Sequence, residues 1–167
     1  PMAMGMIFGV LYFRLDIVML QLMTEEEVVG FYSAAYKLFE VSVVLPHSFM
    51  VVLFPTLVEE HHSDQILFKK RFKKVIAIFS LIGGSIALVL WGFSHEIIKM
   101  IYGDKFFPSA QILDVLAAST FLFFISFLLS HVLIASGREK VNTLSLVGAV
   151  ALNITLNLVW IPQYGAI

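Results

Sequence analysis

Long apolar stretches, separated by short polar segments, dominate the chain. Five of them approach or exceed the roughly 20 residues that a helix needs to cross about 30 Å of hydrocarbon: 1–23, 28–58, 75–93, 110–136 and 141–161. The third stretch contains no charged residue, so it is apolar on every side of a helix, whereas a core helix in a soluble protein has one apolar stripe. The pattern predicts an all-α fold. We expect a polytopic transmembrane helix bundle of about five membrane-spanning helices, forming a single unit over residues 1–167.

Composition supports a membrane protein. Hydrophobic residues make up 59% of the 167 residues and charged residues 14%, whereas soluble domains contain about 45–50% and 25%. These values exclude a disordered chain and a basic nucleic-acid-binding domain, so we predict the lipid bilayer, and no nucleic acid, as a partner. The chain has no cysteine, and the adjacent His61 and His62 point to different faces of a helix. We therefore predict no metal site and no cofactor.

The polar connections alternate in charge, and this predicts an orientation. Segments 59–74 and 137–140 are basic, whereas 24–27 contains three glutamates and no basic residue. Basic loops stay on the cytoplasmic side, so we predict that the Pro1 side is cytoplasmic. Within 64–74, Phe68 and Phe72 lie four residues apart among five basic residues. This pattern is typical of a basic amphipathic cytoplasmic segment lying in the lipid headgroups, with a loop that only fixes topology as the alternative.

The second predicted span carries a polar stripe. At 100° per residue, four polar side chains fall on one side of this helix: Ser33, Lys37, Glu40 and His47. An ionised group at bilayer depth costs at least about 2.5–3.5 kcal/mol and faces protein or water. The stripe therefore indicates the wall of a hydrophilic cavity. Alternatively, Lys37 and Glu40 pair at i,i+3 and neutralise each other at the membrane edge.

The first predicted span contains Arg14 and Asp16, which lie on opposite sides of a helix. Asp16 shares its side with Gly5 and Gly9, small residues that allow another helix to approach closely. A structural interhelical hydrogen bond and a substrate contact are equally good interpretations of Asp16. Arg14 needs a partner of opposite charge, for which Glu40 is a candidate.

Small polar residues also recur on the last two predicted spans. One side of the fourth span has Ser119, Ser126 and Ser130, and one side of the fifth has Asn142, Ser145, Asn153 and Asn157. Residues of this kind more often hold helices together than contact substrate, so the pattern favours helix pairing, with cavity contact as the alternative. In the third span, Gly83 and Gly84 predict a point of close packing or bending.

Short sequences follow one another in a particular order along almost the whole chain. They are VGFYSAAYKL at 29–38, FP at 54–55, YG at 102–103, ASGR at 135–138 and IPQYGA at 161–166. In this order they resemble the polysaccharide biosynthesis flippases (O-antigen type) of the multidrug/oligosaccharidyl-lipid/polysaccharide exporter superfamily. No single one of these sequences is diagnostic of that family.

The resemblance implies a transporter of 12 to 14 helices in two lobes around a central cavity. Such proteins move undecaprenyl-diphosphate-linked oligosaccharide from the inner to the outer leaflet of the bacterial or archaeal cytoplasmic membrane. Other polysaccharide assembly proteins are further partners that it implies. The chain would be an internal piece that begins the second lobe, and we expect it to fold poorly without the first.

The resemblance also implies roles for the polar side chains. Lys37 and Arg14 would meet the diphosphate, while Glu40 and Asp16 would take a coupling proton or cation or hold the basic side chains in place. His47 would hydrogen-bond sugar. The remaining candidates for the substrate cavity are Ser33, Asn153 and Asn157.

Enzyme signatures are absent from the sequence. It contains no Gly-x-Ser-x-Gly, His-Glu-x-x-His or Gly-x-x-x-x-Gly-Lys-Ser/Thr motif. We therefore predict a transporter with no catalytic residue. The alternatives are a drug or cation-coupled exporter of the same superfamily, a membrane polymerase or ligase of the same pathway, and a structural scaffold.

Overall fold

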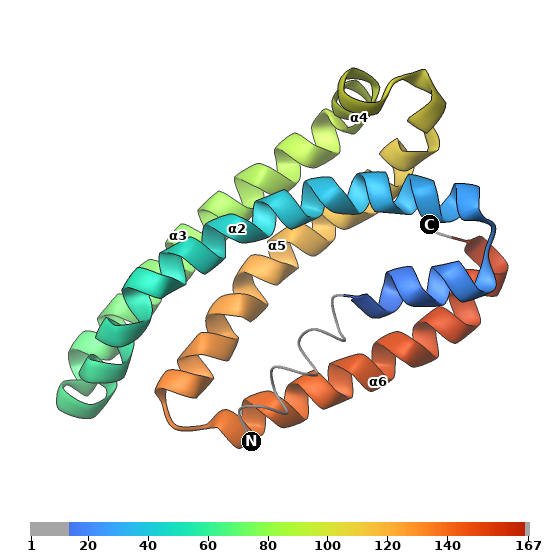
Figure 1. Ribbon diagram of the computed structural model, residues 1–167. Helices are drawn as coiled ribbons and strands as arrows, with labels where there is room; N and C mark the ends of the chain where they lie inside the picture. Colours follow the sequence, from blue (N-terminus) through green and yellow to red (C-terminus); the bar gives the residue numbers. More distant parts are fainter. Residues whose placement is uncertain (1–13, 166–167) are drawn as a thin grey trace.

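The structure, a computed structural model, describes residues 14–165, and these are helical apart from short turns (Figure 1). Residues 14–23 are helical. The helices that follow are α2 (Glu26–Ser63), α3 (Gln65–Gly92), α4 (Ser94–Tyr102), the 3-10 helix η1 (Asp104–Phe106), α5 (Pro108–Ala135) and α6 (Glu139–Tyr164). Within the described residues, α2, α3, α5 and α6 are long and apolar enough to cross a membrane. The predicted all-α polytopic bundle is confirmed. Most of the predicted first span, residues 1–13, lies outside the described residues.

The candidate spans leave most of their apolar surface uncovered by protein. Only 11% to 33% of the residues in the most apolar window of each span are buried. Leu88 and Leu144, for example, are 68% and 73% exposed. Exposing apolar area to water costs about 25 cal/mol per Å², so this surface requires the hydrocarbon of a bilayer around it. The chain is a multi-pass membrane protein.

The helices form two groups. α2, α3 and α5 pack side by side as a three-helix body, while helix 14–23 lies against α6 and forms with it a separate arm (Figure 1). The core of the body contains Met50, Leu57, Phe79, Phe124 and Leu128, all buried. Its tightest point is Gly83 of α3, where a Cβ would lie 2.8 Å from Cβ and Cγ of Phe124 on α5. The predicted close packing is thus confirmed at Gly83.

A single non-helical residue, Asp64, joins α2 to α3. Its Oδ1 accepts hydrogen bonds from the backbone N–H of Ile66 at 2.9 Å and of Leu67 at 3.0 Å, the usual N-cap arrangement. From Gln65 the helix continues without a break to Gly92. The sequence pattern indicated either a separate amphipathic segment or a loop at 64–74. In the structure residues 65–74 are instead the first turns of α3, because no glycine or proline separates them from the apolar span.

A tight turn joins the body to the arm at the other end of α5. Gly137 has φ +70°, its N–H donates to Ile134 O at 2.9 Å, and Arg138 N–H donates to Leu133 O at 2.8 Å. These two bonds and the positive φ define a Schellman motif, in which glycine avoids the strain that a Cβ would introduce. The motif ends α5 and lets α6 turn back beside the cavity described next.

Candidate functional site

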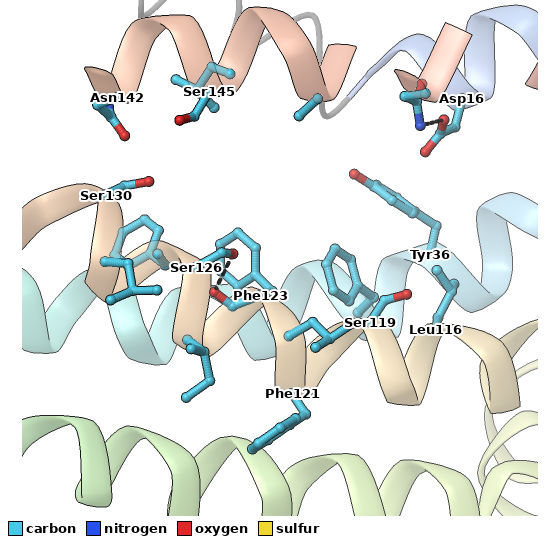
Figure 2. A pocket seen from close by; sticks show the side chains of 18 of the residues that line it. Asp16, Tyr36, Leu116, Ser119, Phe121, Phe123, Ser126, Ser130, Asn142 and Ser145 are labelled. Atoms are coloured by element: carbon cyan, nitrogen blue, oxygen red, sulfur yellow. Dashed lines mark hydrogen bonds between the residues drawn. The ribbon is translucent and has the colours of Figure 1, made fainter. Parts of the chain in front are cut away.

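A cavity of about 990 Å³ separates α5 from the arm. Its size is at the upper end of the roughly 300–1,000 Å³ typical of small-molecule sites. Polar side chains face it from both sides, as Figure 2 shows: Ser119, Ser126 and Ser130 from α5, Asn142 and Ser145 from α6, and Asp16 from helix 14–23. Asn153 of α6 also lines the cavity. The rest of the lining is mainly apolar. It includes the aromatic side chains of Tyr32, Tyr36, Phe39, Phe121, Phe123 and Phe127, together with aliphatic side chains such as Leu116, Leu122, Ile125 and Leu146.

Within residues 14–165, the serine stripe of α5 makes no hydrogen bond to another helix. Ser126 Oγ donates to Phe123 O at 3.1 Å, and Ser119 Oγ donates weakly to Val115 O at 3.4 Å, so both hydroxyls bond to their own helix. Their other hydrogen-bonding capacity is directed at the cavity. Between this stripe and the facing side of α6 lies the cavity, so among the described residues the stripe borders the cavity, which was the alternative interpretation, and its pairing with another helix stays a prediction.

Asp16 joins the two helices of the arm. Its Oδ1 accepts hydrogen bonds from Nδ2 of Asn153 at 2.8 Å and from Nδ2 of Asn157 at 2.7 Å. Asn157 also donates to Oδ1 of Asn153 at 3.2 Å, and Tyr32 OH of α2 donates to Asp16 Oδ2 at 3.4 Å. The interhelical bond expected as one interpretation of Asp16 is present. The same carboxylate lines the cavity, so the two interpretations do not exclude each other.

A second group of charged side chains joins helix 14–23 to α2: Arg14, Lys37 and Glu40. One carboxylate, that of Glu40, contacts Lys37 Nζ at 3.2 Å through Oε2 and an Arg14 guanidinium nitrogen at 3.8 Å through Oε1. The candidate partner of Arg14 and the expected Lys37–Glu40 pair are both observed. The side chains of Arg14 and Lys37 are 63% and 70% exposed, against 31% for Glu40. Two cations thus share one anion on an open face.

The polar stripe predicted on the second span does not line the 990 Å³ cavity. Ser33 is half-buried, and Lys37 and His47 are exposed, with the His47 ring 5.9 Å from that of Phe127. The α2 wall of the cavity is formed by the adjacent face, by Tyr32, Tyr36 and Phe39. Substrate contacts of the predicted stripe stay predictions.

Sequence reasoning missed the aromatic wall. Tyr32, Tyr36 and Phe39 recur at i, i+4 and i+7 and are all buried, which is also the spacing of ordinary packing residues. The signal available in the sequence was the pair of tyrosines four residues apart, whose ring centroids lie 5.7 Å apart in the structure. Residues 14–165 contain no cluster of three or more histidine, aspartate or glutamate side chains arranged to hold a metal ion.

Comparison with known proteins gives one result. A family model described as "Polysaccharide biosynthesis protein" matches residues 1–61. No curated protein and no solved structure matches the chain. The matched segment includes helix 14–23 and nearly all of α2, and with them Arg14, Asp16, Lys37 and Glu40.

Proposed function

We propose that this multi-pass membrane protein acts as a flippase, a proposal supported by the match of residues 1–61 to the polysaccharide biosynthesis family and by the apolar helices. Its cargo would be undecaprenyl-diphosphate-linked oligosaccharide, moved from the inner to the outer leaflet of a bacterial or archaeal cytoplasmic membrane for surface polysaccharide such as O-antigen or capsule. The chain would contribute to a two-lobed transporter of 12 to 14 helices. In this proposal the protein moves its cargo and catalyses no covalent step.

The observation that carries the proposal is the cluster of Arg14, Lys37 and Glu40. Lys37 lies about 11 Å along α2 from the middle of the helix, less than the roughly 15 Å half-thickness of the hydrocarbon in a centred span. Exposed charges at that depth face water or protein, because lipid does not solvate them. The open side of this cluster therefore borders an aqueous or protein-lined space.

The net charge of that cluster suits a phosphate ligand. Glu40 compensates one of the two cations and leaves an excess of one positive charge on an open face. In a low-dielectric setting, a guanidinium and an ammonium are strong donors to diphosphate oxygens. Arg14 and Lys37 would thus hold the diphosphate, while Glu40 keeps their side chains in position.

The cavity between α5 and the arm supplies groups suited to a glycan. Serine hydroxyls and asparagine amides along its two walls can donate to and accept from sugar hydroxyls, and the aromatic wall offers flat apolar faces. Asp16 lies at this cavity with its carboxylate already bonded to Asn153 and Asn157, a position from which it would take part in coupling to a proton or cation.

The proposal is tested by complementation. The intact protein is expressed in strains that lack their own lipid-linked glycan flippase, and surface polymer and accumulated lipid-linked intermediate are measured. We expect the wild type to restore polymer and clear the intermediate. Arg14→Gln and Lys37→Gln should leave the intermediate accumulating at normal expression.

Lys99→Gln is the matched control. Lys99 is also 70% exposed and also paired with one carboxylate, Asp104 at 3.0 Å, but it lies on the short helix α4. Normal export by Arg14→Gln and Lys37→Gln would refute the phosphate role. Persistent intermediate in every strain, combined with drug efflux by the wild type, would favour the exporter alternative.

A further inference from the structure

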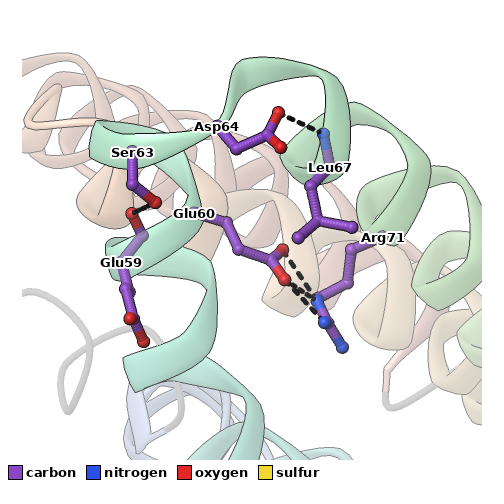
Figure 3. Close-up of polar contacts among 6 residues, drawn as sticks. All are labelled: Glu59, Glu60, Ser63, Asp64, Leu67 and Arg71. Carbon is purple, nitrogen blue, oxygen red and sulfur yellow. Dashed lines mark hydrogen bonds and ion pairs between the residues drawn. The ribbon is translucent and has the colours of Figure 1, made fainter.

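The basic segment at the start of α3 divides into one cation that is paired and four that are open. Arg71 Nε donates to both carboxylate oxygens of Glu60, each at 2.7 Å, and the Glu60 side chain is only 7% exposed (Figure 3). This pair joins α3 to the end of α2. It lies beside the Asp64 cap, so the α2–α3 corner is fixed by two independent polar contacts.

The remaining four cations are directed away from the protein. All four are exposed, and no ion pair to any of them is found within residues 14–165: Lys69, Lys70, Lys73 and Lys74. At 100° per residue they fall within an arc of about 140° on α3. Phe68 and Val75, on the opposite side, are buried. The lysines therefore form one face of a helix whose other side is packed against the body.

This face lies at the level of lipid headgroups. With 28 residues, α3 is about 42 Å long, close to the roughly 40–45 Å of a bilayer including its headgroups. The charge-free part of the helix begins at Val75, and Lys70, Lys73 and Lys74 lie within about 8 Å of it along the axis. Their ammonium groups are thus level with phosphates rather than in bulk water.

We propose that Lys69, Lys70, Lys73 and Lys74 form a binding surface for anionic phospholipid headgroups, such as phosphatidylglycerol, in the leaflet at this end of α3. Charge complementarity supports the lipid assignment, because the four cations have no counter-ion among residues 14–165 and immediately precede the charge-free part of the span. The Glu60–Arg71 pair and the Asp64 cap hold the lysines in a fixed array. This surface is independent of the transport proposed above.

The test uses the purified intact protein in neutral detergent. Its melting temperature is measured with added phosphatidylglycerol and with added phosphatidylcholine, at low and at high salt. We expect phosphatidylglycerol to raise the melting temperature by several degrees more than phosphatidylcholine does at low salt. This difference should disappear near 1 M salt, where the screening length falls to about 3 Å.

Variants assign the effect to the surface. The combined variant K69Q/K70Q/K73Q/K74Q should lose the phosphatidylglycerol-specific shift, and K69Q/K70Q and K73Q/K74Q should each lose part of it. K99Q/K105Q, which removes two lysines of α4 and η1 beyond the other end of α3, should keep the full shift. If the fourfold variant does not fold, the two pair variants carry the test.

Three results would overturn the proposal. One is equal stabilisation of the wild type by the two lipids, and another is an unchanged phosphatidylglycerol shift in the lysine variants. The third is an equal shift with inorganic pyrophosphate, which would make the surface a general anion site rather than a lipid surface.

Discussion

Asp16 places its two strong hydrogen bonds on one oxygen. Both asparagine amides donate to Oδ1, whereas Oδ2 has only the longer 3.4 Å contact with Tyr32 within the described residues. An asparagine at this position would still offer a carbonyl oxygen to the two amides but would carry no charge. Substitution can therefore separate the structural role of Asp16 from its charge.

We predict that Asp16→Leu destabilises the protein by about 1–2 kcal/mol, because two interhelical hydrogen bonds are lost and such bonds in membranes contribute about 0.6–1.7 kcal/mol each. Asp16→Asn should cost less than about 0.5 kcal/mol and still abolish export if the charge is used in coupling. Unfolding in detergent measures the first effect and complementation the second.

Asp104 provides the control for this pair of variants, since its side chain is 83% exposed and lies outside the arm. Asp104→Leu and Asp104→Asn should differ little in stability. The assignment of an interhelical role fails if Asp16→Asn is as destabilising as Asp16→Leu.

At the scale of single residues, the sequence indicates which side chains need an ion-pair or hydrogen-bond partner, but in general not which residue that partner is. Arg14 needed an anion, and Glu40 was identified because it is the acidic residue on the next predicted span. The partner of Asp16 could not be identified in this way. Periodicity places Asn153 and Asn157 on one side of a helix but does not say which helix that side meets, and the partner lies more than 130 residues away.

At the scale of helices, the contact between α3 and α5 depends on one glycine. The Cβ that Gly83 lacks would lie 2.8 Å from the Phe124 Cβ, an atom close to the backbone that cannot swing aside. The adjacent Gly84 has its nearest contact, with the Phe121 ring, at an ordinary 3.8 Å. Two neighbouring glycines in one helix therefore have different tolerance for the same methyl group.

We expect Gly83→Ala and Gly84→Ala to change stability in opposite directions. Alanine is favoured over glycine in a helix by about 0.5–1 kcal/mol, and Gly84→Ala should show this gain. In Gly83→Ala, overpacking of about 1–3 kcal/mol should exceed the gain and lower the melting temperature. If both variants were stabilised, the close α3–α5 contact would be incorrect.

The pair that joins α2 to α3 gives a further prediction. Glu60→Gln should lower the stability of the protein, because it leaves Arg71 without its anion. The loss should be smaller than for a fully buried pair, since the Arg71 side chain is 36% exposed and water can reach it. Glu59→Gln is the control, because Glu59 is exposed and its carboxylate has no ion pair among the described residues. Chemical unfolding in detergent measures both, and equal stability of the two variants would contradict the role of the pair.

Helix positions were largely predictable from apolar length, whereas helix continuity was not. Apolar length located α2, α3, α5 and α6 because a span must exceed a fixed thickness. Apolar length placed residues 65–74 outside the span, because these residues are polar. They are nevertheless the start of α3, because lysine, arginine and leucine are good helix formers. The serine stripe of α5 was ambiguous for a similar reason, since small polar residues are equally suited to helix contacts and to the wall of a cavity.

At the scale of the whole molecule, the cavity lies between two groups of apolar helices, and its mainly apolar lining carries a set of polar side chains. Its walls belong to α5 and to the arm, whose outer surfaces expose leucine and valine side chains suited to lipid. If the cavity holds water in the membrane, residues that line it are open to water-soluble reagents. Residues on the outer surface of the same helices are not.

Thiol labelling tests this distinction, and the chain has no native cysteine to interfere. In membrane vesicles, Ser126→Cys and Ser145→Cys should react with a water-soluble thiol reagent at least about tenfold faster than Leu144→Cys, because thiolates form readily only in a polar setting. Leu144 is adjacent to Ser145 but does not line the cavity. Equal labelling at 144 and 145 would mean that the cavity is closed to water or filled with lipid.

The arm is attached to the body at both of its ends. At one end helix 14–23 turns into α2, and Met19 and Leu20 share a buried core with Tyr36 of α2 and Leu113 of α5; at the other end is the Gly137 turn that precedes α6 (Figure 1). Because both ends are held, the arm cannot swing away from the body; the motion that its attachments leave open is a roll about its own long axis. Asp16 is hydrogen-bonded to Asn153 and Asn157 of α6, so such a roll would move Asp16 at one end of the arm and Asn142 at the other end in the same direction. The two ends of the cavity are thereby mechanically linked through α6.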